Sequence, residues 1–273
     1  MNEYMNEEII IKQCICCWYD LLGYGQPFID SNWNLKDPRC KVNIQRIENV
    51  RDWFWGILST CHKATKLYFN DGSISNIDVD TNCDKSLYSA LFFLEAIIRD
   101  YIAVNDVDRR MGFPGVRGVL TCGHRFDYEY TNTSFDLAEN RTVAYYPREF
   151  QMNTAFSKAF IMEESGSKAG IKGANLYIDK ELFKFFQRTF EYKENHNIQV
   201  QEMDDNLKVI ITFDNEWFAT VILDKELVIY ENRGINTELC RLVSIDSKLD
   251  DMAKEAARQQ ALRFALMEEI SEE

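Results

Sequence analysis

The chain has 273 residues, 46% of them hydrophobic, with only 12 glycines and 4 prolines. This composition excludes a largely disordered protein and is enough to bury a full core in one large domain or two small ones. The formal net charge is −13, so the average surface repels DNA or RNA, whereas a small nucleotide can still bind where a local metal site overrides the overall field.

The cysteines raise the question of disulfide bonds or a metal site. The first residues, MNEYMNEE, are acidic and lack the basic segment of a signal peptide, so we expect reduced, mostly buried thiols in a cytoplasmic protein. Strand alternation places Cys14 and Cys16 on one face and Cys17 on the other, which favours core thiols over one tetrahedral metal site. The longest apolar stretch contains Glu95 and is too short to span a bilayer, so we expect no membrane segment. The eight cysteines are Cys14, Cys16, Cys17, Cys40, Cys61, Cys83, Cys122 and Cys240.

The first predicted element is a strand that begins near Ile9 and ends at Asp20. Its residues from Ile15 to Tyr19 are continuously apolar, which is typical of a central strand that is buried on both faces. Gly23 and Gly25 indicate a turn directly after it.

A helix, a hairpin and a second helix follow. The apolar residues between Ile44 and Leu58 recur on one helical face. The segment TKLYFNDGSISNIDV predicts two short strands joined at Asn70, Asp71 and Gly72, because an Asp-Gly pair between two strand-like runs favours a hairpin. A long helix is predicted from Lys85 to Val104.

The second half of the core is predicted to contain two strands and a helix. A strand from Val116 to Phe126 leads into a polar stretch from Asp127 to Pro147, which we interpret as an excursion at the sheet edge. A helix from Phe150 to Glu164, the loop GSKAGIKG and the strand ANLYID complete the pattern. The order strand, helix, hairpin, helix, strand, helix, strand predicts an α+β fold with a ferredoxin-like βαββαβ core.

The composition changes from about Asn206. The segments KVIITF, WFATVIL and ELVIY predict three short antiparallel strands. A final helix with an apolar stripe is predicted to begin near Asp246 or Ser247, either of which is a favourable N-cap. We therefore expect a main domain over residues 1–195 and a C-terminal extension of strands and a helix over residues 196–273.

Two acidic residues fall at strand ends of the predicted sheet. Asp20 closes the first strand and Asp71 lies in the hairpin, which a βαββαβ order places beside that strand, so the two carboxylates should meet at one sheet end. Converging carboxylates repel each other unless a cation lies between them, and two such ligands, completed by phosphates and water, suit Mg²⁺ or Mn²⁺. Each residue alone also has a simpler role, Asp20 as a turn cap and Asp71 as an ordinary hairpin residue.

Three segments together resemble class III nucleotidyl cyclases. WYDLLGYG resembles the first-strand motif of that family, YFNDGSIS resembles its second-metal hairpin, and VRGVLTCGHRF is similar to its later Arg-Gly strand. The likeness covers about Ile9 to Asp179 and is strongest to the bacterial pyrimidine cyclases of Pycsar anti-phage defence. It implies a class III cyclase-type domain that converts a nucleoside triphosphate, CTP or UTP, to a 3′,5′-cyclic nucleotide and pyrophosphate in antiviral signalling.

The same resemblance implies a division of roles. Asp20 and Asp71 would hold two Mg²⁺ or Mn²⁺ ions, which activate the ribose 3′-hydroxyl for attack on the α-phosphate. The family builds its sites across a two-fold interface, so the resemblance implies a homodimer. A tight turn after a strand points N–H groups at anions, so four backbone amides could cradle the triphosphate. These amides belong to Leu21, Leu22, Gly23 and Tyr24.

The phosphate-stabilising part of the site departs from the family pattern. Cyclases of this class carry an asparagine, which positions the ribose, and an arginine, which stabilises charge on the phosphate, four residues apart on the third helix. This chain has Asn153 and Ser157 there. Lys158 is the next residue, but it points about 100° further round the helix and is not an obvious substitute. Either another cation serves, Arg117 or Arg148, or the protein is a degenerate cyclase, because a transition-state cation contributes several kcal/mol.

Two of these assignments have simpler alternatives. Arg117 could be an edge-strand arginine paired with surface acids. Lys66 could reach the nucleotide base, or it could be a solvated strand lysine. Three functions remain open: a homodimeric nucleotidyl cyclase, a catalytically degenerate protein that binds a nucleotide as a sensor or sponge, and an acidic interaction module without a nucleotide site.

Overall fold

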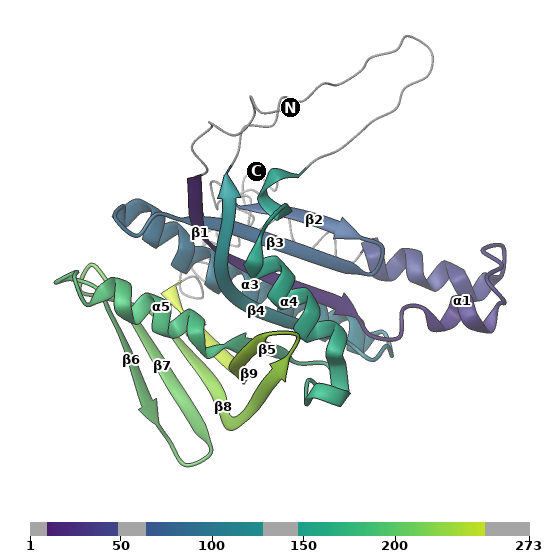
Figure 1. Ribbon diagram of the computed structural model, residues 1–273. Coiled ribbons are helices and arrows are strands. Elements are labelled where there is room, and N and C mark those ends of the chain that lie inside the picture. The colour runs from purple at the N-terminus through teal and green to yellow at the C-terminus, as the bar shows by residue number, and fades with distance from the viewer. Residues whose placement is uncertain (1–9, 49–63, 128–146, 249–273) are drawn as a thin grey trace, which may run out of the picture. The chain divides into compact units, whose positions relative to one another are not determined.

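Figure 1 shows the protein as a computed structural model, which describes residues 10–48, 64–127 and 147–248. Three predictions fall largely on the other residues and lie outside the described part of the chain. They are the second half of the helix that ends at Leu58, the polar excursion that ends at Pro147, and the final helix, of which only Lys248 is described and is helical.

The chain divides into two compact units that are interleaved in sequence. The first unit comprises Met1–Phe185 and Leu227–Arg241, and the second comprises Phe186–Glu226 and Leu242–Glu273. These units differ from the predicted division at residue 195, which stays a prediction. The difference arises because the chain returns to the first unit, where the end of the Leu227–Arg241 segment pairs with the last strand of the core.

The described elements of the first unit follow the predicted order of strands and helices. In chain order they are β1 (Ile10–Leu21), α1 (Gln26–Asp30), a 3₁₀ turn (Pro38–Cys40), a helix described over residues 41–48, β2 (Thr65–Phe69), β3 (Gly72–Val79), α3 (Asp84–Arg110), β4 (Val116–Asp127), a 3₁₀ turn (Arg148–Phe150), α4 (Thr154–Ser165), a 3₁₀ turn (Gly166–Ala169) and β5 (Leu176–Asp179).

The sheet of the first unit has the strand order β2-β3-β1-β4-β5. β1 pairs antiparallel with both β3 and β4, and β2 pairs antiparallel with β3. The connection through α4 returns the chain in the same direction, so β4 and β5 are parallel. The predicted α+β, ferredoxin-like βαββαβ arrangement is therefore confirmed, with the first strand between the hairpin and the strand that follows α3.

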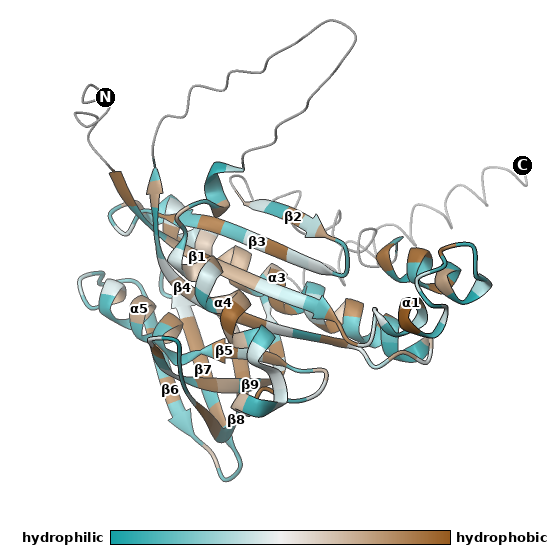
Figure 2. Ribbon diagram, turned by 45° about the vertical axis from the view of Figure 1, so that its right-hand side comes forward, coloured by the Kyte–Doolittle hydropathy of each residue, from teal (hydrophilic) through white to brown (hydrophobic). Residues whose placement is uncertain are grey.

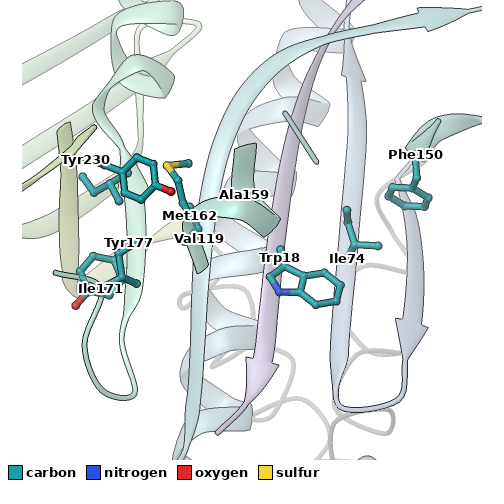
Figure 3. Close-up of a cluster of buried hydrophobic side chains, with 10 residues drawn as sticks. Trp18, Ile74, Val119, Phe150, Ala159, Met162, Ile171, Tyr177 and Tyr230 are labelled. Atoms are coloured by element: carbon teal, nitrogen blue, oxygen red, sulfur yellow. The ribbon is translucent and has the colours of Figure 1, made fainter. Parts of the chain in front are cut away.

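Helices cover both faces of this sheet, with α3 on one side and α4 on the other (Figure 1). The β1 residues from Cys14 to Tyr19 are all buried, which confirms that β1 is a central strand covered on both faces. Side chains alternate along a strand, so Trp18 faces α4 whereas Tyr19 faces α3. On the α4 side, Trp18 belongs to a buried cluster with side chains of β3, β4, α4 and β5 (Figure 3).

α4 begins four residues later than predicted. The apolar pattern suggested a start at Phe150, but Phe150 ends a 3₁₀ turn and Met152 has a left-handed backbone with φ of 48°. A non-glycine residue in that conformation cannot continue a right-handed helix. The helix therefore begins at Thr154, and Asn153 is its N-cap.

The second unit contains antiparallel strands in the order β6-β7-β8. β7 (Asn206–Phe213) was predicted, but the next two predicted strands form one long strand, β8 (Glu216–Asn232). The polar run around Lys225 suggested a turn. In the structure its side chains are exposed and the backbone continues as a strand. The pattern also missed three elements. They are α5 (Lys180–Phe190), β6 (Asn197–Glu202) and β9 (Ile235–Ser247).

The described cysteines are free thiols, and all of them except Cys83 are buried, as expected for core residues. Cys61 lies outside the described residues. A separate finding concerns membranes: in the described part of the chain no helix combines the length and the apolar character that crossing a bilayer needs.

Candidate active site

Asp20 and Asp71 lie beside each other at one end of the sheet. Asp20 is the second-last residue of β1 and pairs with Gly72, the first residue of β3. Asp71 directly precedes Gly72, and its carbonyl oxygen accepts a 3.0 Å hydrogen bond from the Leu21 amide. The first strand and the hairpin therefore bring two acidic residues to the same sheet end, as the strand order predicted.

The Asp20 carboxyl group lies where negative charge is unfavourable. Burial, the Asp71 carboxylate and the Glu163 carboxylate raise its pKa from 3.8 to about 8, and Arg117 and Arg46 only partly oppose this effect. A carboxyl group in this position favours a bound proton or a bound cation. No larger group of acidic, His and Cys side chains that could hold a metal occurs among the described residues, so most ligands of a Mg²⁺ ion here would be water and substrate oxygens.

The hairpin that carries Asp71 requires a glycine for a reason that the sequence pattern does not reveal. A Cβ atom on Gly72 would lie 2.4 Å from the indole ring of Trp18, so any larger residue would displace that ring or the turn. Asn70, the first residue of the turn, adopts φ of 50°, which asparagine tolerates better than most residues. The turn is thus fitted against β1 by direct contact with Trp18.

The turn after Asp20 does not present four free amides. The amides of Leu21, Leu22 and Tyr24 already donate hydrogen bonds to carbonyl oxygens within the protein. The prediction that these three amides hold a triphosphate therefore conflicts with the backbone hydrogen bonds that close the turn. Gly23 is exposed, and its amide has no hydrogen-bond partner among the described residues, so it alone of the four could meet a phosphate oxygen.

A buried arginine that the sequence did not single out holds this turn in place. Arg46 is only 1% exposed and forms two 2.8 Å hydrogen bonds with Asp108, while its guanidinium also donates to the Leu22 carbonyl oxygen at 3.1 Å. Asp108 also accepts a bond from the Gly115 amide, whose carbonyl oxygen receives the Leu22 amide. The backbone after Asp20 is therefore fixed to α3 and to the start of β4.

Arg117 is the one predicted cation that lies beside Asp20. The two residues are directly opposite each other in the β1–β4 pairing, so their side chains share the α4 face of the sheet. Arg117 is not on an edge strand, because β4 lies between β1 and β5. Its partner is also not a surface acid: its Nε lies 2.8 Å and its Nη2 2.6 Å from Oε1 of Glu163, which is buried.

Asn153 has a structural role that accounts for all of its polar atoms. Its Oδ1 accepts a 2.9 Å bond from the Phe156 amide and caps α4, while its Nδ2 donates to Asn76 Oδ1 at 2.9 Å and to the Glu149 carbonyl oxygen at 2.7 Å. The side chain is buried, so the predicted contact with a ribose is not available in this conformation. The exposed Ser157 donates to the Asn153 carbonyl oxygen.

Two further cations are absent from the Asp20 end. Lys158 forms an ion pair of 3.6 Å with the buried Asp179, so its charge is engaged away from the place of the missing arginine. Arg148 is exposed in the 3₁₀ turn before α4. At the start of α4 the Asn153 backbone bridges Arg125, which pairs with Lys12 of β1, and the Asn153 side chain reaches Cys14 and Cys16 of the same strand.

Lys66 is neither a base contact at the Asp20 site nor a solvated lysine. Its side chain is 5% exposed and its Nζ lies 3.0 Å from Asp100 Oδ2 of α3, within hydrogen-bond distance of the Tyr19 hydroxyl. Tyr19 and Asp20 are neighbours in a strand and face opposite sides of the sheet. Lys66 therefore belongs to the α3 side, where burial lowers its pKa to about 8 although Asp100 opposes this effect.

A cavity of about 550 Å³ opens at the N-terminal end of α4, far from Asp20 along β1. Its walls include Ile11, Met152 and Ser157, and the exposed start of β1 beside it is strongly apolar (Figure 2). This is the end of the molecule that carries Asn153 and Arg148. Of the predicted catalytic residues, Arg117 thus lies beside Asp20, whereas Asn153 lines this cavity at the start of α4.

Sequence reasoning missed Glu163, which touches both Arg117 and Trp18. A signal for it exists. Ala155, Ala159 and Glu163 recur every four residues on the buried face of α4, so a single acid interrupts an otherwise apolar stripe. A buried acid in such a stripe needs a partner, which is a sign of a specific local network.

The sequence matches no protein-family model, and no curated protein matches it. Among solved structures, the adenylyl cyclase CyaB from P. aeruginosa is 9% identical with a TM-score of 0.45, over 87% of this chain and 97% of that one. The guanylyl cyclase Cya2 is 10% identical with a TM-score of 0.45, over 89% and 97%. The guanylate cyclase domain of RhGC from Catenaria anguillulae, in complex with GTP, is 9% identical with a TM-score of 0.42, over 86% and 98%. These likenesses are too distant to assign a function.

Proposed function

We propose that this chain is a nucleotidyl cyclase that converts a nucleoside triphosphate to a 3′,5′-cyclic nucleotide and pyrophosphate. The observation that carries the proposal is the juxtaposition of Asp20 and Asp71 across β1 and β3, where repulsion from Asp71 helps to raise the pKa of Asp20 to about 8. Two carboxyl groups that are held together against their mutual repulsion are suited to bind a divalent cation. The donor set, two carboxylates with open positions for phosphate and water, fits Mg²⁺ or Mn²⁺.

In this proposal Asp20 and Asp71 hold two metal ions, which when bound lower the pKa of the ribose 3′-hydroxyl and neutralise charge on the departing pyrophosphate. The exposed Gly23 amide donates to a phosphate oxygen. Arg117, opposite Asp20 in the strand pairing, places positive charge on the same face of the sheet as the reacting phosphate.

The proposal includes a homodimer. The Asn153 side chain lies within 3.7 Å of Cys16, four residues and therefore about 13 Å from Asp20 along β1, and its polar atoms are already hydrogen-bonded, so within one chain it does not meet a nucleotide at Asp20. An isologous dimer would set the α4 end of one protomer against the Asp20 end of the other and form two equivalent sites. The resemblance to pyrimidine cyclases favours CTP or UTP as substrate and a role in antiviral signalling.

The test is to incubate the purified chain with ATP, GTP, CTP and UTP separately in Mn²⁺ and to measure pyrophosphate and cyclic nucleotide. We expect product with a pyrimidine nucleotide and none from Asp20→Asn, which keeps the shape of the side chain and removes its charge. No product from any of the four nucleotides would reject the proposal.

One observation supports a second candidate, a nucleotide-binding sensor or sponge without turnover. Ser157 stands where the family has an arginine, and the nearby Lys158 is held by Asp179. A nucleotide that binds only the folded state raises the melting temperature. Stabilisation by a nucleotide with Mn²⁺, together with no product over hours, would favour the sensor.

A further inference from the structure

Glu163 is a buried acid in an apolar helix face. The residue is 5% exposed and shares that face of α4 with Ala155, Ala159 and Met162, which are fully buried. An unpaired carboxylate there would destabilise the fold, so the side chains that bind the Glu163 carboxylate indicate its role. Among the described residues, the partners of its carboxylate come from β1 and β4, the two strands that lead to the Asp20 site.

Each carboxylate oxygen of Glu163 binds a different side chain. Oε1 accepts from Arg117 Nε at 2.8 Å and lies 2.6 Å from Arg117 Nη2. Oε2 accepts from the indole Nε1 of Trp18 at 3.2 Å. Two contacts from one guanidinium to one oxygen fix the plane and the direction of Arg117, which is 16% exposed and lies opposite Asp20.

Trp18 extends the same network to the hairpin. Its indole lies against Gly72, where a Cβ atom would be 2.4 Å from the ring, and its other neighbours include the rings of Phe69 at 6.4 Å and Phe160 at 5.2 Å. Figure 3 shows Trp18 on β1 next to Ile74 of β3. The indole is therefore enclosed, and rotating it would move the turn that carries Asp71.

We propose that Glu163 is a positioning residue: its carboxylate aims Arg117 at the phosphate that lies beside Asp20 and, through Trp18, fixes the hairpin that holds Asp71. This inference rests on the proposed function, because the phosphate belongs to the nucleotide of that reaction. Glu163 itself touches neither substrate nor metal. The site depends on the negative charge of Glu163 and on the directions of its two carboxylate oxygens.

The test uses the full chain and the nucleotide that the wild type converts best. Glu163→Gln keeps the shape of the side chain but turns an NH₂ group toward either Trp18 or Arg117, both of which are donors. We expect kcat to fall about 10- to 100-fold while KM changes less than about threefold, because the guanidinium is lost chiefly to the transition state. Glu164→Gln is the matched control, since Glu164 is exposed and pairs with the exposed Arg233, and its kcat should be unchanged.

A second pair of variants separates positioning from a general structural role. In an Arg117→Met background, Glu163→Gln should lower kcat by no more than about threefold to tenfold, the loss expected from the Trp18 contact alone, because the guanidinium that it aims is gone. Trp18→Phe keeps an aromatic ring and removes only the indole donor, so it remains informative if Glu163→Gln does not fold, and it should lower kcat about threefold to tenfold. Full additivity of the two losses, or an unchanged kcat in Glu163→Gln, would overturn the inference while leaving the cyclase proposal intact.

An inactive wild type would instead reject the proposed turnover. In a protein without turnover Arg117 can serve only the bound triphosphate, so the measurement is then calorimetric binding of a triphosphate with Mn²⁺, which Glu163→Gln should weaken about tenfold relative to Glu164→Gln. Equal affinities, or no binding by the wild type, would overturn the positioning role as well.

Discussion

Asp20 combines two properties that rarely occur together in a purely structural acid. It is placed at a strand end beside a second acid, and its folded-state pKa of about 8 lies well above its ordinary value of 3.8. The folded state therefore binds a proton at Asp20 more tightly than the unfolded chain does. The stability that depends on this proton is complete below about pH 4 and is lost as the pH rises through 8.

This linkage gives a prediction for the metal-free protein. Asp20→Asn should be more stable than the wild type at pH 9, by on the order of a few kcal/mol, and equally stable near pH 4. Mn²⁺ should raise the melting temperature of the wild type at pH 9 and leave that of the variant unchanged. Melting curves at the two pH values check this, and a variant that is no more stable than the wild type at pH 9 would contradict the assigned environment.

Lys66 gives a second prediction at the scale of single residues, in which the substitution lowers stability. Lys66→Met removes the cation from the buried contact with Asp100 and Tyr19 and should destabilise the fold by about 3–5 kcal/mol in urea unfolding, with no change in KM for the nucleotide. Lys12→Met is the control. Lys12 is 39% exposed and its pairing with Asp127 should contribute less than about 1 kcal/mol. A raised KM with normal stability would instead restore the base contact that the sequence suggested.

At the scale of elements, α4 packs on β1 and β4, and the Asn153 cap determines the residue at which the helix begins. Asn153→Ala removes the acceptor for the Phe156 amide and the donor to Asn76, both buried, so unfolding should become easier by about 1–3 kcal/mol. Ser157→Ala, one turn further on and exposed, should change stability by less than about 0.5 kcal/mol. Equal stability of Asn153→Ala and the wild type would show that the cap is not important.

The same helix allows a gain-of-function test. Ser157 is exposed and borders the 550 Å³ cavity, so Ser157→Arg introduces a guanidinium into open space. If that position serves the phosphate, kcat should rise about tenfold or more, since one well-placed cation contributes several kcal/mol to such a reaction. Ser157→Gln introduces a polar side chain without a charge, so it should leave kcat unchanged. An arginine without effect would indicate that Arg117 or Arg148 already fills the role.

The sequence predicted the elements of the first unit well because its signals are local. The apolar run of β1, the Asp-Gly hairpin and the helix before β4 each follow from periodicity or turn chemistry. β8 was divided in error, because a polar run such as the one around Lys225 looks the same in a turn and on an exposed strand. The start of α4 was misplaced, because the left-handed backbone of Met152 depends on the cap and not on the apolar pattern.

Part of the candidate site could also be predicted from the sequence. Asp20 and Asp71 occupy strand ends, and strand order alone brings such ends together. The roles of Lys66 and Asn153 were not predictable, because strand alternation and helix capping depend on exact boundaries. Arg46 and Glu163 could not be placed from spacing alone, since their partners lie in segments far away along the chain.

For the whole molecule, the placement of Asp20 at one sheet end and of Arg148 before the start of α4 leads to a complementation test. Asp20→Asn and Arg148→Ala are each expected to be inactive as homodimers. Mixing them at equal concentration should restore about a quarter of wild-type activity, because half of the dimers are mixed and each mixed dimer has one intact site. Product formation before and after mixing measures this. No recovery, with exchange of subunits verified, would contradict a site shared between protomers.

The length of β1 has one more consequence if the site is shared. A chain in which Asn153 is engaged in capping α4, about 13 Å from Asp20 along β1, carries two half-sites and no whole one. The rate of synthesis would then rise with the square of the chain concentration below the dimer dissociation constant, and linearly above it. A cell could hold such a protein silent simply by keeping it scarce, and a modest increase in its abundance would switch on second-messenger production without any dedicated activator.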